Sequence, residues 1–146
     1  MMTMKMKIAG LLMLLSFTLT AQETNRVTFE QSLEKAKTEN KKVLLFFSGS
    51  DWCAPCVKFK KYFVTTEPFL QFSNENLVVF NADFPRLKKN QLPAEIMQEN
   101  EKLAEKYNNN GLFPLILLLN NKGEILKKWE HYPTETLDEF IAKLKG

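Results

Sequence analysis

The sequence predicts one α/β domain, a three-layer sandwich in which helices cover both faces of a mixed β-sheet. Uninterrupted apolar runs at residues 43–47, 77–82 and 115–119 are typical of strands that are covered on both faces. Segments with helical spacing of apolar residues separate these runs, so we expect crossover connections and a parallel portion of the sheet. Turn residues at 120–123 and an alternating segment follow the last run, which predicts an antiparallel hairpin at one edge.

The composition is that of a folded domain and excludes several other classes of protein. Of 146 residues, 45% are hydrophobic and 25% are charged, with only five glycines and six prolines, which excludes collagen-like and wholly disordered chains. Lysine and arginine (20) exceed aspartate and glutamate (17) by three, too small a bias to indicate a nucleic-acid partner. Two cysteines and one histidine cannot supply a four-ligand Cys/His zinc site.

Local signals predict the elements of the first half of the domain. Thr28 and Gln31 have the spacing of a capping box, and apolar residues then recur on one helical face over residues 29–40. After the first strand, a helix is expected over residues 53–64 and continues irregularly past Pro68. The second strand follows this helical region.

The second half is predicted in the same way. Pro93 suits the first turn of a helix whose apolar stripe runs to residue 107. The run at 115–119 is the most apolar strand of the chain, so we expect it near the middle of the sheet. Residues 124–130 alternate as an antiparallel partner should, and Thr134 is expected to cap a last helix.

Residues 1–21 have the features of a secretory signal peptide. Two lysines precede an uncharged apolar run of 12 residues at 8–19, whereas a helix that spans a bilayer needs about 20. Ala21 is small, as a cleavage site requires, although Leu19 is not. We therefore expect residues 22–146 to form the domain, exported to the periplasm or secreted. Cleavage of the leader and its retention as an anchor are both compatible with this sequence.

The two cysteines, Cys53 and Cys56, stand at the start of the helix that follows the first buried strand. At this spacing their sulfurs can meet on the first turn, in a ring of four residues. By the chain-entropy relation, a disulfide that closes so short a loop stabilises the folded state by about 2 kcal/mol, against about 3 for a loop of fifteen residues. A purely structural cross-link therefore explains the pair poorly. At a helix N-terminus the Cys53 thiolate would be stabilised as the nucleophile of thiol–disulfide exchange, and Cys56 could then attack Cys53 and release the product.

Two stretches of the sequence resemble the thioredoxin family. The first is VLLFFSGSDWCAPC, which is similar to the strand, Trp-Cys-x-Pro-Cys motif and helix of that family. The second is residues 106–124, which resemble the segment with the family's cis-proline and its two final strands. The resemblance spans the mature chain in order and is greatest to exported bacterial thioredoxin-like proteins, including thioredoxin-like domains of thiol:disulfide interchange proteins. It implies a thioredoxin-like sandwich with thiol–disulfide oxidoreductase activity.

The resemblance also implies roles for individual residues. Cys53 matches the attacking cysteine, Cys56 the resolving cysteine, and the two form the redox-active disulfide. Trp52 matches the aromatic residue beside the substrate. Pro114 matches the cis-proline that packs against the disulfide, and the backbone of Phe113 would bind an extended substrate strand. From the residues alone, Pro114 could equally be a trans proline that opens a strand.

The sequence departs from the family at a position concerned with proton transfer. The buried aspartate that thioredoxins carry six residues before the first cysteine is replaced by Phe47, and its lysine partner by Val79. We therefore expect the Cys56 thiol to lose its proton to water or to a carboxylate such as Asp51. A slower or more pH-dependent step than in a cytosolic thioredoxin is the expected consequence.

Two further features leave alternatives open. Residues 83–92 are longer than the equivalent thioredoxin stretch and carry Arg86, Lys88 and Lys89, so the stretch either shapes partner choice or is a solvated loop. His131 is expected at the surface, and together with the two cysteines it falls one ligand short of a metal site. We expect neither a metal nor a cofactor.

The sequence favours a monomeric reductase of protein disulfides in the cell envelope. Pro55 and the absence of histidine between the cysteines resemble the reducing members of the family. A reductase in an oxidising compartment must be supplied with electrons, so we expect a membrane thiol–disulfide carrier as a partner. A disulfide oxidase or isomerase is the alternative among enzymes. The alternative that is not an enzyme is a non-catalytic module that binds partners through Trp52 and Phe113.

Overall fold

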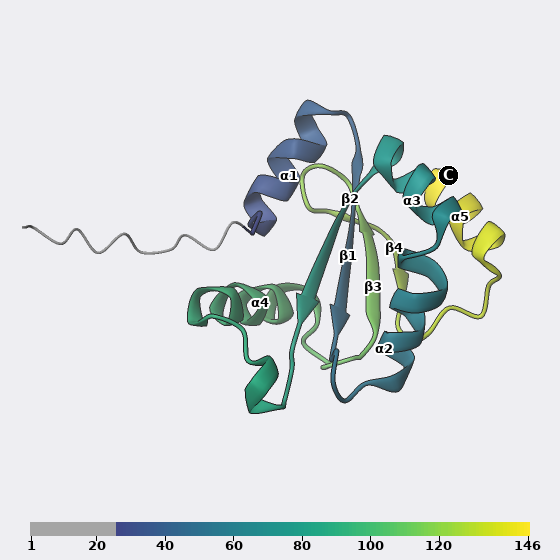
Figure 1. Ribbon diagram of the computed structural model, residues 1–146. Helices are drawn as coiled ribbons and strands as arrows, with labels where there is room; N and C mark the ends of the chain where they lie inside the picture. The colour runs from purple at the N-terminus through teal and green to yellow at the C-terminus, as the bar shows by residue number, and fades with distance from the viewer. Residues whose placement is uncertain (1–25) are drawn as a thin grey trace, which may run out of the picture.

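Four strands form one mixed sheet in the computed structural model, which describes residues 26–146. The strand order is β2-β1-β3-β4, so β3 lies in the middle of the sheet, as its sequence predicts, next to β1 (Figure 1). β1 is parallel to β2 and antiparallel to β3, and β3 and β4 form the predicted antiparallel hairpin. The strands are β1 (Lys42–Ser48), β2 (Leu77–Asp83), β3 (Leu115–Leu119) and β4 (Ile125–Trp129).

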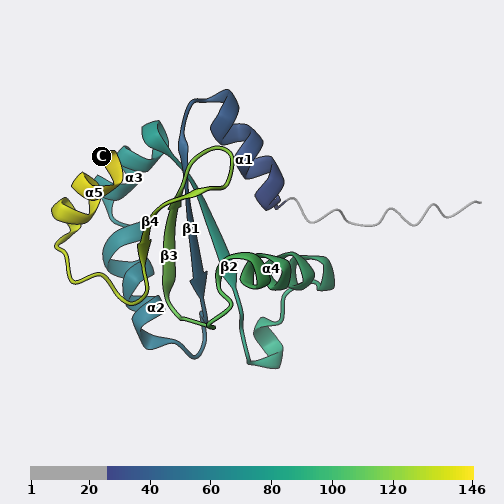
Figure 2. The same cartoon turned by 180° about the vertical axis from the view of Figure 1, so that it is seen from behind.

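Helices cover both faces of this sheet and complete the predicted three layers. α1 and α4 lie on one face, and α2, α3 and α5 lie on the other (Figures 1 and 2). Because neighbouring strand residues point to opposite faces, Phe46 packs beneath α2 while Phe47 packs beneath α1 and α4. The helices are α1 (Phe29–Thr38), α2 (Ala54–Phe59), α3 (Glu67–Asn76), α4 (Ala94–Tyr107) and α5 (Leu137–Lys145).

The helix predicted over residues 53–64 is divided, and a separate helix follows it. α2 passes into a π-helical turn, Lys60–Val64, before α3 begins at Glu67. The hydroxyl groups of Thr65 and Thr66 donate to the carbonyls of Lys60 and Phe63, at 3.0 and 2.7 Å, and so satisfy groups that a continuing helix would have used. Pro68 lies in the first turn of α3, where no backbone N–H is required.

The helix caps show one correct prediction and one wrong one. Thr28 and Gln31 form the predicted capping box of α1. The cap of α5 is Thr136 rather than Thr134, because only Thr136 has an acidic residue three positions later: its hydroxyl accepts from the N–H of Glu139, whose carboxylate accepts from the N–H of Thr136.

The predicted leader, residues 1–21, and the start of the mature chain at Gln22 lie outside the described residues. Among the helices of residues 26–146, none is both long and apolar enough to cross a bilayer.

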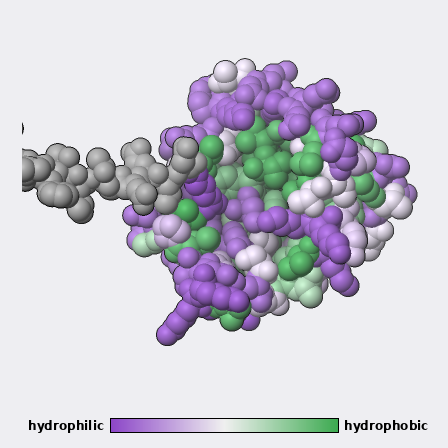
Figure 3. All heavy atoms as spheres, viewed as in Figure 1, coloured by the Kyte–Doolittle hydropathy of each residue, from purple (hydrophilic) through white to green (hydrophobic). Residues whose placement is uncertain are grey.

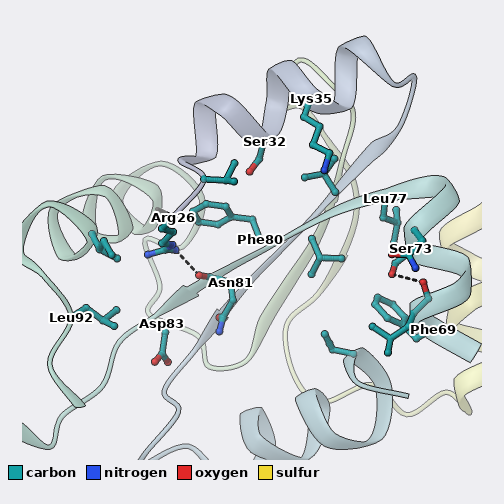
Figure 4. Close-up of a pocket in the computed structure, with 17 residues that line it drawn as sticks. Arg26, Ser32, Lys35, Phe69, Ser73, Leu77, Phe80, Asn81, Asp83 and Leu92 are labelled. Atoms are coloured by element: carbon teal, nitrogen blue, oxygen red, sulfur yellow. Dashed lines mark hydrogen bonds between the residues drawn. The ribbon is translucent and has the colours of Figure 1, made fainter. Parts of the chain in front are cut away.

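The outer edge of β2 borders a groove of about 670 Å³ between α1 and α3 (Figure 4). Apolar residues gather in the middle of this face (Figure 3). Val79 is 37% exposed there, and the Arg26 guanidinium donates to the Asn81 carbonyl at 2.9 Å. No cysteine lines this groove, so the candidate chemistry lies elsewhere.

Candidate active site

The two cysteines lie at the end of the sheet where β1 and β2 terminate (Figure 1). Cys53 and Cys56 form a disulfide with an S–S distance of 2.06 Å. Cys53 is the N-cap of α2, and its sulfur accepts from the backbone N–H of Cys56 at 3.3 Å. A sulfur at this position faces the unpaired N–H groups of a helix, which stabilise negative charge once the bond is reduced.

A proline with a cis peptide bond stands at the start of β3, at the same end of the sheet. The Phe113–Pro114 bond is cis, which is the isomer that the resemblance to thioredoxins implies. Pro114 is buried, whereas Phe113 is partly exposed. The ring of Phe113 meets the Trp52 indole edge to face, with 5.1 Å between centroids. The two aromatic residues predicted to contact substrate therefore lie side by side.

Trp52 is fixed by contacts that the sequence does not show. Its indole N–H donates to the Phe84 carbonyl at 2.7 Å. Gly49 makes room for the ring, because a Cβ built there would lie 2.2 Å from indole atom Cε2. Any side chain at position 49 would displace the indole, so the loop before the disulfide requires glycine at this point.

Asp51, one of the groups expected to be able to take the proton of Cys56, holds a loop. Its carboxylate accepts from the backbone N–H groups of Arg86 and Leu87, both at 2.9 Å, and from Asn90 Nδ2 at 3.0 Å. These donors, the Arg86 N–H foremost, lower the pKa of the Asp51 carboxyl from its usual value, although desolvation opposes them. All three bonds tie the β2–α4 loop to the turn that carries Cys53.

This arrangement predicts a pH-dependent docking of the loop. Because the folded state lowers the pKa of Asp51, the stabilisation is complete above the usual pKa of about 4 and is lost as the pH falls through the lower folded value. We expect the amide protection factors of Arg86 and Leu87 to fall on acidification, and Asp51→Asn to lower them already at pH 6. Asp138→Asn, which removes an exposed carboxylate of α5, is the matched control. Equal protection in Asp51→Asn and wild type would contradict this account.

At the position where thioredoxins carry the buried aspartate, Phe47 lies opposite Ala82 and packs beneath α1 and α4, while Val79 lies opposite Leu44. Neither side chain can take up a proton. A carboxylate is present at the end of the neighbouring strand, where Asp83 of β2 pairs in register with Ser48 of β1.

Asp83 and Cys56 line one pocket of about 420 Å³ behind the disulfide. The Asp83 carboxylate accepts from the Ser48 hydroxyl at 3.0 Å, and from the Ser50 N–H and hydroxyl at 2.8 and 2.6 Å. Asp83 and Ser50 were not identified as site residues from the sequence. The available signal was a carboxylate at the carboxyl end of a buried strand, beside the strand that leads to the cysteines.

The structure describes no metal site. Within residues 26–146, no three His, Cys, Asp or Glu side chains are placed to hold an ion. His131 is exposed after β4, and its Nδ1 lies 2.9 Å from the carbonyl oxygen of Tyr132. The phenylalanines that follow the cysteines belong to the core, since Phe59, Phe63 and Phe69 are all buried.

The family profile described as thioredoxin-like matches residues 23–121. The chain belongs to the thioredoxin-like family. The disulfide bond reductase DsbH of Chlamydia pneumoniae is 32% identical over 119 residues, which are 82% of this chain and 69% of that protein. The thioredoxin-related protein DsbJ of the same organism is 30% identical over 99 residues, 68% of this chain but only 28% of that protein.

Solved structures agree with this membership. A DsbH oxidoreductase superimposes with a TM-score of 0.71 at 30% identity, covering 81% of this chain and 79% of the other. A disulphide isomerase from Xylella fastidiosa gives 0.62 at 16% identity, covering 90% and 100%, and supports the fold alone. The predicted thioredoxin-like sandwich is therefore confirmed.

Proposed function

We propose that this member of the thioredoxin-like family reduces disulfide bonds of other proteins, with Cys53 as the nucleophile and Cys56 as the resolving cysteine. The observation that carries the proposal is the disulfide between these residues at the N-terminus of α2, at the same end of the sheet as cis-Pro114. Two relatives named as a disulfide bond reductase and a thioredoxin-related protein support it.

The exchange of sulfur–sulfur bonds uses the two sulfurs of the chain. The Cys53 thiolate attacks one sulfur of a substrate disulfide, whose S–S bond breaks, and the departing substrate sulfur takes up a proton. Cys56 then loses its proton and attacks the Cys53 sulfur, which breaks the mixed disulfide and releases the second substrate thiol. Two electrons pass from the dithiol to the substrate, and the enzyme is left with its Cys53–Cys56 disulfide.

The pocket behind the disulfide gives the proton of Cys56 a route out. Its lining brings together Cys56 and Asp83, with Lys60 and Lys61 as the other titratable side chains. The hydroxyl of Ser50, which donates to Asp83, also lines this pocket. We infer that solvent in the pocket carries the proton toward Asp83, so Cys56 has a carboxylate within its own cavity.

Asp83→Asn should therefore slow the resolving step. Asparagine keeps the shape of the side chain but removes its negative charge, so we expect about a tenfold longer lifetime of the mixed disulfide at pH 6, less than the 10²–10⁴ of a base in direct contact. Quenched-flow trapping from pH 5 to 8 measures this lifetime, and the pH–rate curve of the variant should be steeper. Asp138→Asn again provides the control. Superimposable curves for Asp83→Asn and wild type would exclude a part for Asp83.

We place this activity in the cell envelope. The leader predicted at residues 1–21 directs export, and cleavage after Ala21 would release the domain formed by residues 22–146. In an oxidising compartment the disulfide must be reduced again after each cycle, which calls for a membrane thiol–disulfide carrier as electron donor.

Insulin reduction with dithiothreitol as the electron source tests the proposal. Wild type should precipitate the insulin B chain well above the background rate, and Cys53→Ser should not. Equal rates would favour a non-catalytic binding module. Equilibration with glutathione measures the reduction potential and so shows the direction of electron transfer. A potential near that of thioredoxin, about −270 mV, supports a reductase, and one near −120 mV supports an oxidase.

A further inference from the structure

A groove beside the disulfide combines an aromatic lining with one cation. Its volume is about 540 Å³, and its borders are Trp52, which precedes Cys53, and Phe113, which precedes cis-Pro114. Arg86 alone is charged among the described residues that line it. The remaining lining residues are Phe84, Pro85, Met97 and Gly111.

Arg86 is held in place from two directions. Its backbone N–H donates to Asp51 Oδ1 at 2.9 Å, and its guanidinium carbon lies 3.7 Å from the centroid of the Trp52 ring. Stacking of this kind occupies one face of the planar group and leaves its in-plane N–H donors free. No side chain or carbonyl of residues 26–146 forms a hydrogen bond or ion pair with this guanidinium.

The charges around the groove are predominantly positive. Lys88 and Lys89 follow Arg86 in the short 3-10 turn Lys88–Asn90, and both are exposed. Two carboxylates lie nearby, those of Asp51 and Asp83. Both keep their negative charge, but each already accepts three hydrogen bonds, Asp51 from the β2–α4 loop and Asp83 from Ser48 and Ser50. The Arg86 guanidinium is therefore the charged group of this groove that is free to bind a group of the partner.

We propose that Arg86 binds an Asp or Glu side chain of the partner protein next to its reactive disulfide, while an apolar neighbour of that residue enters the groove. The inference rests on the proposed function, because it names the class of partner which that function requires. A guanidinium with free in-plane donors matches a carboxylate in bidentate geometry. Because the Arg86 guanidinium stacks on Trp52, its orientation is already fixed before the partner binds, so little conformational entropy is lost on binding. The β2–α4 loop thus selects acidic segments.

Three peptides that differ in one residue test this selection. Each is closed by one disulfide with phenylalanine beside a half-cystine, and carries glutamate, glutamine or lysine next to that phenylalanine. For wild type recycled by dithiothreitol, we expect kcat/KM for the glutamate peptide to exceed that for glutamine by about fivefold, with lysine lowest, as for a strong exposed pair. The preference should diminish at 1 M NaCl, where charges are screened beyond about 3 Å.

Variants assign the preference to one residue. Arg86→Gln should abolish the difference between the glutamate and glutamine peptides, and Arg86→Glu should reverse the order of glutamate and lysine. Lys122→Glu makes the same change in net charge at the exposed β3–β4 turn, at the other end of the sheet, and should keep the wild-type order (Figure 1). If net charge alone set the preference, Arg86→Glu and Lys122→Glu would change the order of kcat/KM for the peptides in the same way.

The outcomes separate this inference from the proposed function. Equal kcat/KM for the three peptides, with insulin still reduced, overturns the selection of acidic partners and leaves the reductase intact. An unchanged preference in Arg86→Gln also overturns it, because another group would then bind the carboxylate. Failure of the wild type to reduce any peptide or insulin overturns both proposals.

Discussion

Replacing Cys56 with serine should leave Cys53 covalently joined to its substrates. Without a second sulfur, the mixed disulfide formed by the attack of Cys53 has no internal route to release, so it should accumulate while turnover falls to the dithiothreitol background. Cys53→Ser should form no such adduct, because the sulfur at the helix N-terminus is the one proposed to attack. Non-reducing gels and mass spectrometry of the protein recovered from its own cell envelope measure the adducts.

The two serine variants are matched controls for each other. Both lose the same four-residue cross-link, which the chain-entropy relation values at about 2 kcal/mol, so a difference between them reports chemistry and not folding. Equal trapping by Cys53→Ser and Cys56→Ser would contradict the assigned roles. The trapped partners would also show whether acidic residues flank their disulfides.

Phe59→Ala should destabilise the folded domain by about 3–5 kcal/mol, as for other buried phenylalanines that are truncated to alanine. Phe59 is fully buried, at 0% exposure, and its ring lies 5.5 Å from those of Phe46 and Phe63 and 5.8 Å from that of Phe140. These contacts anchor α2 to the sheet and to α5, so the cavity left by alanine would be enclosed on all sides.

Urea denaturation of the disulfide-bonded protein measures this loss. Val57→Ala is the matched control on the same helix, because Val57 is 48% exposed and should change the free energy of unfolding by no more than about 0.5 kcal/mol. A loss below about 1 kcal/mol in Phe59→Ala would show that α2 is held chiefly by other contacts.

The sequence was sufficient to predict the layers and the sheet because burial leaves a direct pattern. β1 and β3 are covered on both faces, so their residues form continuous apolar runs. The turn before β4 uses the side chain of Asn120, which accepts from the N–H of Lys122, and Gly123 at a φ of 81°. The cysteine pair could be placed because a strand and the start of a helix bracket it. These are local signals, and each lies within a few residues of the feature that it predicts.

The features that were missed depend on register and on contacts distant in sequence. A shift of one residue along a strand exchanges its two faces, so the opposite faces of Phe46 and Phe47 follow only from the paired sheet. Asp83 could not be linked to Cys56 without the pairing of β1 and β2. The bonds from Asp51 to the loop at Arg86 span 35 residues and follow no local periodicity.

Asp51 recognises the main chain at positions 86 and 87 rather than their side chains. The anchorage therefore tolerates any residue that keeps a backbone N–H, and proline is the one natural replacement that would break it. The side chains at positions 86 and 87 can therefore change without altering the docked conformation of the loop. Such a segment can be diversified, by evolution or in a library, to recognise new partners while the sulfur chemistry next to it stays the same.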